Sequence, residues 1–187
     1  MASARIAGGL FLALVAFGGV GAVGACASTP DPNAETTVAV SPEAFRDFAG
    51  GGANVGVQGM LAARCGSLDC HGAVGQSLRI FSEFGLRLQD DAGNIPGGAA
   101  TTPSEIFATY LAVIDIQPEL TTKVFHGALD PHELLLLRKP LGLERHKGGQ
   151  VLASDDVGDI CLTTWLTDGL DGGAINNKAC NTAAGQL

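Results

Sequence analysis

The sequence is poor in aromatic residues, methionine and positive charge. Its 187 residues include eight Phe, one Trp, one Tyr and only two Met. So few aromatic side chains predict a modest core, because these residues bury the most apolar surface each. Eleven Lys and Arg stand against nineteen Asp and Glu, giving a net charge of −8. This balance argues against nucleic acid or an anionic membrane face as the partner.

The common catalytic motifs are also missing. There is no Gly-x-Ser-x-Gly, no His-Glu-x-x-His and no phosphate-binding loop. The acidic pairs Asp90-Asp91 and Asp155-Asp156 are typical of solvated loops rather than of an acid–base pair. We therefore expect a carrier or binding protein more than an enzyme.

The N-terminal segment 1–25 has the features of an export signal. Arg5 is its lone positive charge, and an apolar run rich in Gly and Ala follows from Ile6 to Val23. The run leads into Gly24-Ala25-Cys26, which is typical of a bacterial lipoprotein signal whose cysteine is lipidated. A transmembrane anchor is the alternative, because the run is nearly long enough to span a bilayer. Its paired glycines and its end at Cys26 favour cleavage.

Lipid on Cys26 would anchor the protein to a membrane without spanning it. Ala27 stands where Asp retains many such lipoproteins in the inner membrane. We therefore expect the periplasmic face of the outer membrane or the cell surface. Residues 26–41 have no apolar period and predict a flexible tether. The folded domain then covers residues 42–187.

Residues 65–71, Cys-Gly-Ser-Leu-Asp-Cys-His, are the most informative stretch. Two thiols followed directly by a histidine are what covalent haem attachment requires, since each thiol can form a thioether with one vinyl group. The histidine can then bind the iron. The usual signature places two residues between the cysteines, whereas four separate Cys65 from Cys70. A disulfide loop with an incidental histidine is the alternative. A zinc site formed by these three residues and a further histidine is less favoured.

The cysteine count fits an exported protein. Of five cysteines, Cys26 is assigned to lipid, which leaves the close pair Cys65 and Cys70 and the distant pair Cys161 and Cys180. These four form either two disulfides, or one haem attachment and one disulfide. An oxidising compartment favours a Cys161–Cys180 bridge, which would pin the polar C-terminal tail.

Short helices and Gly-rich loops are the expected structure. Helices are predicted over 55–64, 103–113 and 156–170 from their apolar spacing. A further helix is predicted to begin at Asp130-Pro131-His132-Glu133, run through Leu137 and end before Pro140. The runs 78–81 and 86–88 have the character of short strands, and residues 90–102 that of a loop. The fold class is therefore mostly α.

A haem iron would need a second ligand from the chain. Met60 is the only methionine besides the initiator and precedes the cysteines, which makes a His/Met pair unfavourable. His132 would be solvated in the first turn of its helix. His126 lies in a loop and is the second choice. His146 is the best candidate, because Gly148 and Gly149 after it permit close approach of a large planar ligand.

Several motifs in order resemble a known family. Apart from the cysteine motif, they are the Leu135–Pro140 run, the His146-x-Gly148-Gly149 loop, and Trp165 in the last helix. Over roughly residues 45–170 this order resembles the cytochrome-c-like domains of exported planctomycete and myxobacterial proteins. The wider cysteine spacing and the Cys161/Cys180 pair depart from that pattern.

The resemblance implies a fold of short helices around one covalently bound haem c. Cys65 and Cys70 would carry the haem, His71 would be its proximal ligand and His146 its distal ligand. The expected function is electron transfer by a lipid-anchored monohaem protein, with a redox partner that has a basic docking face. The alternative is a haem-free, disulfide-stapled envelope lipoprotein that acts as a binding or structural module.

Overall fold

The computed structural model describes residues 42–168 and 175–185. The predicted signal, the lipidated Cys26 and the tether lie outside the described residues, as does the predicted end of the last long helix at Leu170. Within the described part of the chain, every helix is too short or too polar to cross a membrane.

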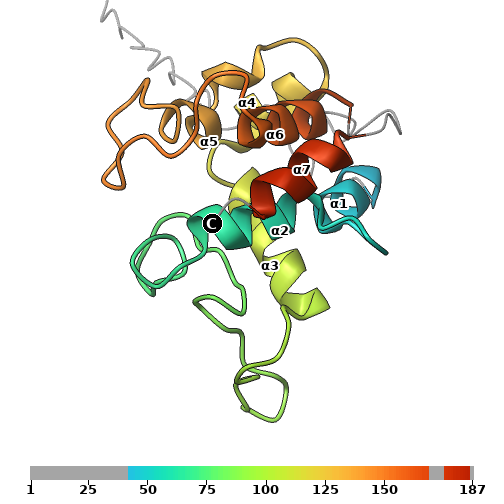
Figure 1. Cartoon of the computed structure of the whole chain (residues 1–187), viewed down its shortest axis with the longest axis vertical. Helices are drawn as coiled ribbons and strands as arrows, with labels where there is room; N and C mark the ends of the chain where they lie inside the picture. Colours follow the sequence, from blue (N-terminus) through green and yellow to red (C-terminus); the bar gives the residue numbers. More distant parts are fainter. Residues whose placement is uncertain (1–41, 169–174, 186–187) are drawn as a thin grey trace, which may run out of the picture. The chain divides into compact units, whose positions relative to one another are not determined.

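Helices form the regular structure of the described residues (Figure 1). They are α1 (Pro42–Ala49), α2 (Gly56–Cys65), α3 (Pro103–Ile114), α4 (Pro118–Phe125), α5 (Leu135–Arg138), α6 (Val157–Asp168) and α7 (Asn177–Ala184), with the 3-10 helix η2 (Pro131–Glu133) before α5. The prediction of a mostly α fold is confirmed. The prediction of short strands at 78–81 and 86–88 is wrong, because the contact between these runs is only an isolated bridge of Phe81 with Leu86.

Local side-chain caps explain where α3 and α6 begin. The Thr102 hydroxyl accepts a hydrogen bond from the Glu105 amide (3.3 Å), while the Glu105 carboxylate accepts one from the Thr102 amide (2.8 Å). This reciprocal capping box, with Pro103 in the first turn, starts α3. Asp156 caps α6 by accepting from the amides of Gly158 and Asp159 (2.8 and 2.9 Å). Both helices agree with the sequence prediction.

The helix predicted from Asp130 through Leu137 is not continuous. Asp130 does cap the His132 amide at 2.8 Å, but Leu134 is extended (φ −77°, ψ 140°) and separates η2 from α5. Leu134 is only 2% exposed, and the Gln117 side chain accepts from the next amide, Leu135, at 2.6 Å. Burial of Leu134 and this tertiary hydrogen bond outweigh the local preference for one helix.

The core is centred on Trp165 of α6. Its indole Nε1 donates to the carbonyl of Ala44 in α1 at 3.0 Å, and its ring lies 5.3 Å from the rings of Phe48 and Phe125. Because a buried indole N–H needs an acceptor, this bond fixes α1 against α6. Met60 is fully buried in the same core, so its thioether serves packing.

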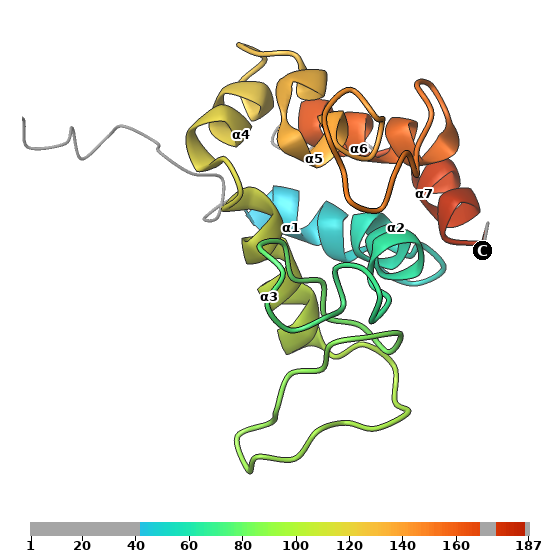
Figure 2. The ribbon, with the colours of Figure 1, turned by 90° about the vertical axis from the view of Figure 1, so that its left-hand side faces the viewer.

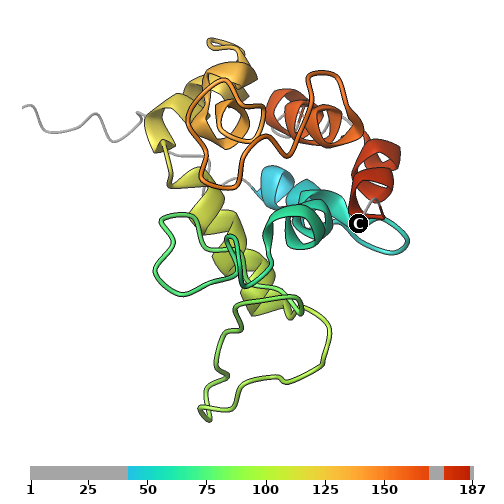
Figure 3. The same cartoon turned by 60° about the vertical axis from the view of Figure 1, so that its left-hand side comes forward.

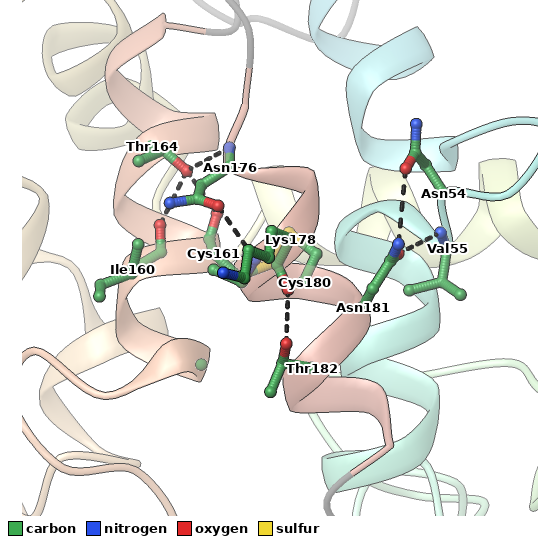
Figure 4. The surroundings of a disulfide bond; sticks show 12 residues. Asn54, Val55, Ile160, Cys161, Thr164, Asn176, Lys178, Cys180, Asn181 and Thr182 are labelled. Atoms are coloured by element: carbon green, nitrogen blue, oxygen red, sulfur yellow. Dashed lines mark hydrogen bonds between the residues drawn. A yellow bond between two sulfur atoms is a disulfide. The ribbon is translucent and has the colours of Figure 1, made fainter.

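The C-terminal segment is a helix held at two places, rather than a polar tail (Figure 4). Cys180 in α7 forms a disulfide with Cys161 in α6, which confirms the predicted pair. Asn181, one residue further, accepts from the Val55 amide at 2.9 Å and donates to the Ala53 carbonyl at 3.3 Å. Through these bonds α7 links α6 to the start of α2.

A buried ion pair holds the loop before α3. The Arg87 guanidinium donates to both carboxylate oxygens of Glu105 (2.8 and 3.0 Å), and the carboxylate is completely buried. The Leu88 amide also donates to Glu105 (2.9 Å), and Arg87 reaches the carbonyls of Ala99 and Ala100 (2.9 and 3.2 Å). Glu105 thus organises both arms of the loop at the N-terminal end of α3 (Figure 1).

Candidate functional site

The Cys65–His71 segment forms a closed loop at the end of α2. The His71 amide donates to the Cys65 carbonyl (2.9 Å), and the amides of Cys70 and Gly72 both donate to the Ser67 carbonyl (3.0 and 2.9 Å). The four residues between the cysteines therefore form a hydrogen-bonded turn. This turn leaves His71 directly beside the end of the helix.

Glycines allow this loop to pack against itself. A side chain at Gly72 or at Gly85 would collide with the backbone carbonyl of Gly66. Because backbone cannot move aside as a flexible side chain can, both positions require glycine. The Ile80 amide also donates to the His71 carbonyl at 2.9 Å, which ties the loop to the segment that follows.

Cys65 and Cys70 are both free thiols and both half-buried. Burial raises the pKa of Cys65 to about 11; the Arg64 cation opposes this shift and the neighbouring Cys70 adds to it. Cys65 is therefore a protonated thiol at neutral pH. The contrast with the bonded pair Cys161–Cys180 is clear, since the two close cysteines are not joined to each other.

His71 has one ring nitrogen engaged and one available. Its Nδ1 lies 3.1 Å from the Leu78 carbonyl oxygen, which can only accept. Burial lowers the pKa of His71, and the nearby His146 and Lys139 lower it further, whereas the hydrogen bond to Leu78 raises it by a smaller amount. The ring is therefore neutral with its proton on Nδ1, and its Nε2 lone pair is free to bind a metal.

His146 repeats this arrangement in the loop after α5. Its Nδ1 lies 2.7 Å from the Gly149 carbonyl oxygen, and the Gly149 amide donates back to the His146 carbonyl at 3.0 Å. Gly149 has a φ of +75°, a conformation that favours glycine. A Cβ on Gly148 would lie 3.3 Å from the imidazole, so the residue leaves room beside the ring. Within the described residues, no hydrogen bond engages Nε2 of His71 or of His146.

The structure brings these two imidazoles together. Their ring centroids are 5.9 Å apart and their planes are nearly parallel, at 10°. The rings are stacked, and their separation is comparable with two metal–imidazole bonds of about 2 Å each plus the radii of the rings. Donation of Nδ1–H to a backbone carbonyl is also the usual way in which a protein orients a metal-binding histidine. Both rings are therefore oriented by backbone carbonyls and lie close together, which makes them candidate ligands of one group.

Arg64 braces the two loops against each other. Its guanidinium donates to the carbonyl of Val151 at 2.8 Å, and the amides of Val151 and Leu152 both donate to the Pro140 carbonyl (2.9 and 3.0 Å). The loop that carries His146 is thus closed at its base and tied to the residue before Cys65. Figures 2 and 3 show this orange loop reaching from α5 toward the end of α2.

The other two described histidines lie elsewhere in the fold. His126 is exposed at the end of α4. His132 lies between two carboxylates, with Nδ1 3.1 Å from Asp130 and Nε2 3.0 Å from the nearly buried Asp159. It therefore links η2 to α6, while its side chain remains 40% exposed, in agreement with the predicted solvation.

A site of the zinc type is not formed. Among residues 42–168 and 175–185, no three His, Cys, Asp or Glu side chains converge in a way that could hold a metal ion. His71 and His146 are thus a pair of imidazoles without a third protein ligand beside them among the described residues.

Some residues that build the site are not evident from the sequence. Arg64 and the acceptor carbonyls of Leu78 and Gly149 orient the candidate ligands. Every residue has a backbone carbonyl, so the sequence does not reveal which carbonyl accepts a hydrogen bond. The Gly148-Gly149 pair was the one local indication. Comparisons with protein-family models, curated proteins and solved structures gave no match.

Proposed function

We propose that this protein is a lipid-anchored, monohaem c-type electron carrier of the bacterial cell envelope. The observation that carries the proposal is the His71–His146 pair, with rings 5.9 Å apart and nearly parallel. Each ring has its Nδ1 at a backbone carbonyl and its Nε2 free. His71, moreover, directly follows the cysteine pair that would carry the haem.

The two free thiols support covalent attachment. Each S–H would add across one vinyl group of the porphyrin, so that a C–S bond forms, the proton goes to the vinyl carbon and no external oxidant is consumed. A disulfide between Cys65 and Cys70 would preclude this reaction, and the structure has none there. Cys65 and Cys70 would hold the group, and His71 and His146 would ligate its iron.

Exposed apolar side chains flank both histidines. Leu68 and Val74 each lie three residues from His71 and are 66% and 84% exposed. Leu143 lies three residues before His146 and is 61% exposed. Three residues span at most about 11 Å, so the Cα atom of each lies within that distance of the Cα atom of His71 or His146. An apolar porphyrin face would give them a partner and supply bulk to a core with few aromatic residues.

Ligation by two histidines favours electron transfer over catalysis. When bound, the haem would supply a one-electron redox centre, and ligands on both faces leave no coordination position for a substrate. Two imidazoles also lack the thioether that raises the potential of His/Met cytochromes. We therefore propose a low-spin centre of comparatively low potential within a cytochrome-c-like arrangement of helices.

The absorption spectrum of protein produced with a haem-c maturation system tests the proposal. We expect a Soret band and a sharp reduced α-band that survive acid–acetone extraction, since thioether bonds resist it. A variant with Cys65→Ser and Cys70→Ser should lose the extraction-resistant signal, while Cys161→Ser and Cys180→Ser should keep it. Intact mass showing Cys65 joined to Cys70 without an added macrocycle would refute the proposal in favour of a haem-free, disulfide-stapled module.

A further inference from the structure

Positive charge is concentrated in the segment that carries His146. Residues 138–147 contain four of the eleven Lys and Arg of the chain and a single acidic residue, Glu144. The local balance is therefore the reverse of the net charge of −8. Arg138 is balanced, because it lies 3.3 Å from Glu133 and 3.4 Å from Glu144.

The other three cations of this segment are not balanced. Among the described residues, no carboxylate forms an ion pair with Lys139, Arg145 or Lys147. Arg145 and Lys147 are exposed on either side of His146, and Lys139 is half-buried. Lys139 is close enough to His71 to lower the pKa of its imidazole. Unpaired cations thus border both paired rings.

Because salt screens distant charges, the cations of residues 138–147 dominate the electrostatic interaction with a partner that touches them. At physiological ionic strength the Debye length is about 8 Å, so a docked partner responds to the charges beneath it rather than to the net charge of the chain. Charges at the edge of an interface mainly govern association rate and choice of partner. Carboxylates more than a Debye length away therefore do not offset the cations beside His146. Asp69, the acidic residue of the cysteine loop, forms no ion pair with these cations among the described residues.

We propose that the segment carrying Lys139, Leu143, Arg145 and Lys147 docks an acidic protein surface, which places a redox partner beside the His71–His146 site. This inference rests on the proposed function and identifies its partner by charge. The net charge of the sequence predicted a redox partner with a basic docking face; we propose instead a partner with an acidic one. Leu143, 61% exposed, supplies an apolar contact among the cations, as protein interfaces commonly have.

Binding of fluorescein-labelled poly-L-glutamate to the full-length protein in an uncharged detergent tests this proposal. Fluorescence anisotropy at about 0.1 M salt, where the Debye length is about 10 Å, should detect binding despite the net charge of −8. The double variant Arg145→Gln, Lys147→Gln should raise the Kd about fivefold, because two exposed charge pairs contribute roughly 1 kcal/mol together. Circular dichroism should show both proteins folded alike.

The matched control is Lys123→Gln with Lys178→Gln, which removes two exposed cations from α4 and α7. It should leave the Kd within about twofold. No binding by the parent protein, or an equal loss in the control, would overturn the docking proposal. Binding by haem-free protein that vanishes after haem loading would also overturn it, since the cations would then serve the propionates. The absorption spectrum reports separately on the proposed function, so either proposal can fail alone.

Discussion

Arg64 and Val151 join the two loops of the candidate site across 87 residues of sequence, through a 2.8 Å hydrogen bond from guanidinium to carbonyl. Arg64 directly precedes Cys65, and Val151 follows the turn that presents His146. The bond therefore fixes the distance between the cysteine loop and the second histidine. Positioning of this kind matters because an axial ligand must be held in place before it can bind iron strongly.

Replacing Arg64 by Met should loosen the His146 loop while keeping an unbranched side chain in place. We expect a loss of about 1.5–3 kcal/mol in the free energy of unfolding, the usual effect of losing a hydrogen bond to a charged group. In haem-loaded protein, part of the spectrum should become high-spin and bind added imidazole. Arg79→Met, at an exposed position, is the control and should leave the spectrum unchanged. An identical response of both variants would contradict the positioning role of Arg64.

Removing the second imidazole should change the iron spin state. His146→Ala in haem-loaded protein is expected to convert a low-spin spectrum to a high-spin one, because one axial ligand is lost. Exogenous imidazole should restore the low-spin form. The control is His126→Ala, at the exposed end of α4, which should remain low-spin. The reverse pattern would assign the second ligand to His126.

The ion pair between Arg87 and Glu105 should make stability depend on acid pH. Burial raises the pKa of Glu105, but hydrogen bonds from Arg87, Thr102 and Leu88 outweigh it and lower the pKa from 4.5 to about 2. The unfolded chain therefore binds this proton more readily than the folded chain. The stabilisation is fully present above pH 4.5 and is lost as the pH falls toward about 2.

Glu105→Gln should remove most of this acid dependence and cost about 3 kcal/mol at neutral pH, because it leaves Arg87 without its counter-ion. Urea unfolding at a series of pH values measures both effects. The exposed Glu119, also in the first turn of a helix, supplies the control substitution Glu119→Gln. Parallel stability–pH curves for Glu105→Gln and the parent protein would show that the ion pair does not govern acid unfolding.

Loss of the Cys161–Cys180 disulfide should release α7 from α6. The bridge closes a separation of 19 residues, for which chain entropy predicts a stabilisation of about 3 kcal/mol. Replacing both cysteines by Ala should lower the midpoint of urea unfolding and raise hydrogen exchange of the α7 amides. Asn181→Ala, which removes the side-chain hydrogen bonds to Ala53, Asn54 and Val55, should have a smaller effect. Equal effects would contradict the larger contribution of the disulfide to holding α7 in place.

Local signals explain which helices the sequence could predict. The Thr102–Glu105 cap of α3 and the Asp156 cap of α6 lie within a few residues of the helices they start. A short stretch of sequence is therefore enough to predict where each helix begins. The predicted helix from Asp130 failed because Leu134 is drawn into the core. The helices α1, α4 and α7 went unpredicted, since these short sequences are stabilised by packing on the rest of the fold and, for α7, by the disulfide.

The sequence by itself determined the chemistry available to this protein: two close thiols, a histidine directly after them and a second histidine before paired glycines. Those features are local, so composition and spacing disclose them. Only the tertiary structure decided which histidine meets His71, whether Cys65 and Cys70 form a disulfide, and which cations stay unbalanced beside the site. The first of these relationships joins loops distant in the chain, and it arises because Arg64, the Pro140 carbonyl and the Trp165 core hold those loops together.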